Sequence, residues 1–119
     1  MVTSIWGLPH GVRDALQELF GSPSLDIAEP EGEFQATGAA ATLKRPSRRL
    51  IAAGCSTDHC LVYYERGGGP HAWRVALFRW APDETRFEWG GAAPGGLAAI
   101  TEVRNAVLSG TIESPDRSW

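Results

Sequence analysis

The chain has 119 residues, enough for one domain with a real hydrophobic core but too few for separate catalytic and binding domains. Hydrophobic residues make up 43% and charged residues 21%, which excludes a disordered or fibrous chain. The formal net charge of −3 offers no basic surface to a polyanion, so no nucleic-acid partner is expected.

Neither a membrane segment nor a secretory leader is visible. No apolar run approaches the roughly 18 residues that a membrane helix needs, so no membrane association is expected. The start MVTSIWGLPHGVRDAL lacks the basic and continuous apolar regions of a leader. Because a removed leader leaves no trace, two locations stay open: the cytoplasm if Met1 is the natural start, and the periplasm if a leader preceded it. The oligomeric state is not indicated.

The first predicted element is a helix within LPHGVRDALQELFGSP. Gly21 and Pro23 follow the periodic region and are typical of a helix end. The apolar residues share one helical face, namely Val12, Ala15, Leu16, Leu19 and Phe20.

The next three segments carry weaker signals. LDIAEPEG, residues 25–32, is acidic with a proline and a glycine, and predicts a linker. EFQATGAAATL, residues 33–43, favours a strand only weakly. KRPSRR, residues 44–49, is the one basic cluster and predicts a solvated turn.

From residue 49 the chain consists of short apolar or aromatic runs separated by turn residues, which predicts an antiparallel meander. In the last run Thr85, Phe87 and Trp89 alternate with Arg86 and Glu88, so one face of that strand is expected to be buried. The runs are RLIAAG (49–54), CLVYYE (60–65), HAWRVALFRW (71–80) and TRFEW (85–89).

A second helix is predicted near the C-terminus. Leu97, Ile100, Val103 and Val107 recur at helical spacing, with Gly110 just past the helix end. The preceding GGAAPGG is interpreted as a connection. Residues 1–119 are therefore expected to form a single α+β domain. It consists of an antiparallel sheet of about five strands, flanked by an N-terminal and a C-terminal helix that pack on one face.

The tryptophans and the glycine-rich stretches are better explained by structural roles than by binding of a cofactor. Trp73, Trp80 and Trp89 lie in predicted strands, where core packing explains them better than a sugar or nucleotide platform. The glycine-rich stretches RGGGPH and GGAAPGG lack the spacing of a phosphate loop or a dinucleotide fingerprint. No cofactor is expected.

The stretch GCSTDHC, residues 54–60, contains the densest chemistry of the chain. A zinc site would draw on Cys55, His59, Cys60 and His71, but a C-x₄-C spacing is loose for zinc and His59 would have to turn back sharply. A cysteine nucleophile with His59 as its base is disfavoured, because such pairs normally converge from different elements. A disulfide is therefore favoured over the other two sites, which remain alternatives.

A disulfide here would close a ring between two strands. It would pin the hairpin loop and hold it in its bound shape, which avoids roughly 0.5–1.5 kcal/mol of ordering cost per side chain at an interface. Such a rigid polar protrusion suits insertion into a cleft. The enclosed side chains are Ser56, Thr57, Asp58 and His59.

The loop resembles that of the inhibitor of vertebrate lysozyme (Ivy) family, in which a strand runs into a loop that commonly reads C-K-P-H-D-C and then into another apolar strand. VALFRWAPDETRFEW is similar to that family's next hairpin, and AVLSGTIESPD to its closing segment. The resemblance covers about residues 49–116. It implies an antiparallel sheet of five strands flanked by helices, in agreement with the layout above.

The family resemblance implies a binding protein without catalysis of its own. Its loop, from Cys55 to Cys60, would enter the active-site cleft of a lysozyme or related muramidase, with Asp58 and His59 as the main polar contacts. The loop departs from the family pattern in two ways. Asp58 precedes His59 where the family has histidine first, and Ser56 and Thr57 replace the basic residue and the proline.

The alternatives are a cytoplasmic domain of the same fold with another protein partner, and a thiol or zinc enzyme. In a reducing compartment the two cysteines would stay reduced, and the argument from a rigid loop would fail.

Overall fold

The structure is a computed structural model that describes residues 4–21, 25–30, 32, 48–67, 72–81, 83–93, 95 and 100–109. The strand expected at 33–43, the helical position Leu97, the cap Gly110 and the tail up to Asp116 lie outside these residues. The elements are η1 (Ile5–Gly7), α1 (His10–Phe20), β1 (Arg48–Cys55), β2 (His59–Arg66), β3 (Ala72–Ala81), β4 (Glu84–Ala93) and α2 (Ile100–Leu108).

Helix α1 confirms the prediction made from its apolar spacing. Val12 and Leu16 are fully buried, and α1 ends at Phe20 and is capped by Gly21, which adopts φ 65°. The Gly21 N–H donates to the carbonyl groups of Gln17 and Glu18, as expected for a left-handed C-terminal cap.

The sheet is an antiparallel meander in the order β1-β2-β3-β4, so the α+β class is confirmed. The described residues contain four strands in this sheet. Residues 90–93 continue β4 and are not the connection that their glycines suggested. Gly90 and Gly91 pair with Ala76 and Val75, and these ladder contacts override the low strand propensity of glycine.

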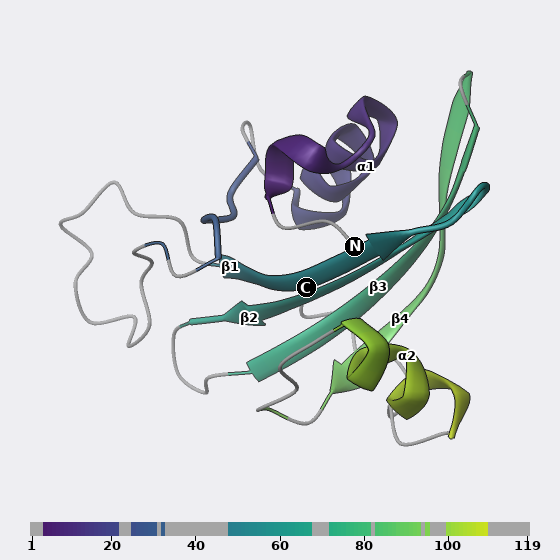
Figure 1. The fold of residues 1–119 in the computed structure, drawn as a ribbon. Coiled ribbons are helices and arrows are strands. Elements are labelled where there is room, and N and C mark those ends of the chain that lie inside the picture. The colour runs from purple at the N-terminus through teal and green to yellow at the C-terminus, as the bar shows by residue number, and fades with distance from the viewer. Residues whose placement is uncertain are drawn as a thin grey trace, which may run out of the picture.

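The two helices cover opposite faces of the sheet, as Figure 1 shows, and not one face as expected. Cys60, Val62 and Tyr64 belong to the core cluster that includes α1, whereas Leu61 and Tyr63 belong to the cluster around Val103 of α2. The two faces of β2 are both apolar and therefore both need a covering layer.

A β-bulge in β4 changes the predicted alternation. Leu77 pairs with Trp89 and Phe78 pairs with Phe87, so Glu88 is the extra residue. Phe87 consequently packs in the α1-side cluster and Trp89 in the α2-side cluster, although the spacing predicted that they share a face.

The three strand tryptophans pack against the cores, as predicted. Trp80 packs against the α1-side cluster, whereas Trp73 and Trp89 pack against the α2-side cluster.

The segment expected to be a linker is docked on the fold. Ala28 forms a parallel bridge with Arg49, and the Glu29 carboxylate accepts hydrogen bonds of 2.6 Å from the Ser4 hydroxyl and the Ile5 N–H. Glu29 therefore accepts hydrogen bonds from residues at the start of η1.

Arg48, which the sequence placed in a solvated turn, is buried in β1. Its Nη1 lies 3.0 Å from Asp26 Oδ2, and its guanidinium lies 3.9 Å from the centroid of the Phe20 ring. Burial lowers the pKa of Arg48 from its ordinary value. The ion pair and the aromatic face compensate the buried charge.

Candidate functional site: the loop between Cys55 and Cys60

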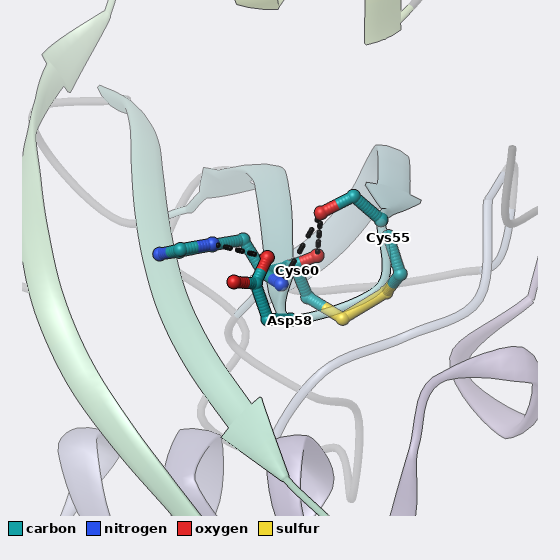
Figure 2. The surroundings of a disulfide bond; sticks show 5 residues. Cys55, Asp58 and Cys60 are labelled. Carbon is teal, nitrogen blue, oxygen red and sulfur yellow. Dashed lines mark hydrogen bonds and ion pairs between the residues drawn. A yellow bond between two sulfur atoms is a disulfide. The ribbon is translucent and has the colours of Figure 1, made fainter.

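Cys55 and Cys60 lie directly opposite each other in the β1–β2 register, with their Cα atoms 4.0 Å apart and their sulfur atoms bonded (Figure 2). The disulfide that the sequence favoured is thus present in the structure. In this oxidised state the pair offers neither two thiolate ligands for zinc nor a thiol nucleophile. His71 lies outside the described residues.

Three hydrogen bonds hold the loop. The Ser56 N–H donates to the His59 carbonyl at 2.7 Å, and the His59 N–H donates to Ser56 Oγ at 3.3 Å. The Asp58 carbonyl accepts from the Trp80 N–H of β3 at 2.9 Å, which ties the loop to the neighbouring strand. The side chains of Ser56, Thr57 and Asp58 stay exposed to solvent on this fixed backbone.

His59 lies between two carboxylates of its own chain. Its Nδ1 is 2.9 Å from Asp58 Oδ1, an interaction drawn in Figure 2, and its Nε2 is 3.4 Å from Glu88 Oε2 on β4. The hydrogen bond to Asp58 raises the pKa of His59, with a smaller contribution from Glu88. The same bond lowers the pKa of Asp58. Both carboxylates therefore favour the imidazolium form.

Glu88 is a site residue that sequence reasoning missed. The alternation along residues 85–89 predicted only that its side chain faces solvent. The bulge in β4 aims its carboxylate at His59, and no spacing rule predicts a bulge at this point.

A cavity of about 490 Å³ lies beside the loop, between the end of the β1–β2 hairpin and α2. At Gly54 an added Cβ would lie 3.0 Å from Ile100 Cγ1, so glycine lets α2 approach β1 closely. The wall formed by the hairpin contains Gly54, Cys55, Ser56, His59 and Leu61, and the rest of the lining is Leu77, Ile100, Thr101, Arg104, Val107 and Leu108.

Within the described residues, no group of three or more His, Cys, Asp or Glu side chains is arranged to hold a metal ion. None of the described helices is both long and apolar enough to cross a membrane. No protein-family model, curated protein or solved structure matches the chain.

Proposed function

We propose that this chain is a binding protein that inserts the loop from Cys55 to Cys60 into the active-site cleft of a lysozyme or related muramidase. The observation that carries the proposal is the loop itself, which is closed by a disulfide, hydrogen-bonded to β3 and exposed at its tip. The target class comes from the sequence resemblance to the lysozyme-inhibitor family.

The loop is suited to binding because much of its ordering is complete before a partner arrives. The disulfide and the bond from Trp80 to Asp58 fix the backbone, and the His59–Asp58 contact fixes two of the side chains. Each side chain that is already ordered avoids roughly 0.5–1.5 kcal/mol of entropy loss on association.

The chemistry of His59 fits a carboxylate target. Enzymes that cleave glycosidic bonds commonly use two carboxyl groups across the scissile bond, and a protonated imidazole donates to such groups. At 3.4 Å the Nε2–Glu88 contact is longer than the roughly 2.7–2.9 Å of a charge-assisted hydrogen bond. His59 can therefore exchange Glu88 for a carboxylate of the partner at small energetic cost.

The proposal is tested by a cell-wall lysis assay with lysozymes of several classes, each with and without the oxidised protein. Inhibition of at least one class, lost after reduction of the disulfide, supports it. Lack of inhibition across the panel, with the disulfide intact, contradicts it and favours a domain of this fold that binds another protein.

A further inference from the structure

The cavity beside the loop has a mainly aliphatic wall. No phenyl, phenol or indole ring of the described residues lines it, so it offers no aromatic platform for a sugar or a nucleobase. Clefts of roughly 300–1,000 Å³ with apolar walls and a few polar groups are typical of small-molecule sites. The aliphatic side chains are Leu61, Leu77, Ile100, Val107 and Leu108.

Arg104 brings a positive charge to this wall. It follows Thr101 on the same side of α2, and both residues line the cavity. None of the residues that the structure describes pairs with Arg104, whereas His59 already faces Asp58 and Glu88. Arg104 is thus a cation of the cavity, and none of the described residues supplies a counter-charge to it.

We infer that the cavity binds a free aliphatic monocarboxylate of medium chain length. The planar guanidinium of Arg104 takes the carboxylate in two parallel N–H···O bonds, and the Thr101 hydroxyl adds a donor one turn away. The alkyl chain then lies against Leu61 and Leu77, where its burial removes apolar surface from water. This ligand class is separate from the protein partner proposed above and does not depend on it.

The first test titrates octanoate, octanol and octylammonium into the full chain and follows amide NMR shifts. Octanoate is expected to shift the signals of α2 and of Leu61 and Leu77. Octanol should bind about tenfold more weakly, because it lacks the charge-assisted bond. Absence of shifts with octanoate, or equal affinity for octanoate and octanol, overturns the inference, as does tighter binding of octylammonium.

Variants give the second test. Arg104→Gln should weaken octanoate about tenfold and leave octanol unchanged, because only the charge contact is removed. Thr101→Trp should fill the cavity and weaken both ligands. Arg86→Gln, a matched change at an exposed arginine of β4 that does not line the cavity, should weaken neither. Equal octanoate affinity in Arg104→Gln and Arg86→Gln contradicts the inference even if Thr101→Trp fails to fold.

Discussion

The Nε2 atom of His59 lies 3.4 Å from Oε2 of Glu88, although the whole of β3 separates the two residues in the chain. The contact joins β2 to β4 across the strand between them. Together with the contact between Nδ1 and Asp58, it connects the loop to the sheet through interactions with two carboxylates. The protonation state of His59 is consequently linked to the conformation of the loop.

The first prediction concerns the titration of His59. Its pKa should exceed the ordinary value of 6.5, because Asp58 and then Glu88 favour the imidazolium. Asp58→Asn should lower this pKa more than Glu88→Gln, since the hydrogen bond to Asp58 is the larger cause. NMR titration of the imidazole signals measures both. Identical His59 curves in the three proteins would show that neither carboxylate acts on the ring.

The pH dependence of stability follows from the same pair. The raised pKa of His59 stabilises the fold below its ordinary value of 6.5, and this contribution is lost as the pH rises through the folded pKa. The lowered pKa of Asp58 stabilises the fold above pH 3.8, its ordinary value, and this contribution is lost as the pH falls through the folded pKa of Asp58. The urea midpoints of wild type and Asp58→Asn should therefore differ most between pH 3.8 and pH 6.5. A difference that is constant from pH 3 to pH 9 speaks against this linkage.

Removing the disulfide should weaken the fold without abolishing it. The double change Cys55→Ala and Cys60→Ala is expected to cost roughly 2 kcal/mol of unfolding free energy, the loop-closure term for so short a ring. Alanine is preferred to serine because Cys60 is fully buried in the α1-side cluster, where a hydroxyl lacks a partner. Urea unfolding measures the loss. An unfolded variant would mean that the ring and not the two cores holds the sheet together.

Val103 is the fully buried residue of α2 and its main anchor on the sheet. Val103→Ala should cost about 2 kcal/mol from lost burial and the cavity left behind. Hydrogen exchange should speed up in α2 and remain slow in α1, which packs on the opposite face. Asn105→Ala, an exposed change on the same helix, should cost under about 0.5 kcal/mol. Equal acceleration in both helices would contradict two separate cores.

Local signals predicted much of the fold correctly. The spacing of Val12 and Leu16 with the glycine after them located α1, because a helix face and its cap are encoded by near neighbours. The meander followed from apolar runs separated by turn residues. The side of the sheet on which each helix lies was missed, although Leu61 and Tyr63 beside Val62 and Tyr64 already indicated two buried faces.

The predictions that were wrong concern features that depend on long-range contacts. The bulge at Glu88 interrupts a regular alternation, and only pairing with β3 reveals it. Arg48 looked like a turn residue because its partner Asp26 and the Phe20 ring come from distant segments. In the site, the cysteine pairing could be predicted from the spacing of the two cysteines between two apparent strands. The cavity could not, because its lining comes from three strands, the loop and a helix.

The most direct measurement is the affinity of the oxidised protein for each lysozyme of the panel proposed above, compared with that of a variant in which residues 56–59 are replaced by glycine and serine and both cysteines are kept. The oxidised wild type is expected to bind at least one of these lysozymes. The control changes Asp83 and Glu84, exposed at the neighbouring β3–β4 turn, to serine. The account predicts that the loop variant folds and binds at least tenfold more weakly, about 1.4 kcal/mol or more, while the control binds like wild type. Wild-type affinity in the loop variant would contradict the loop as the binding epitope.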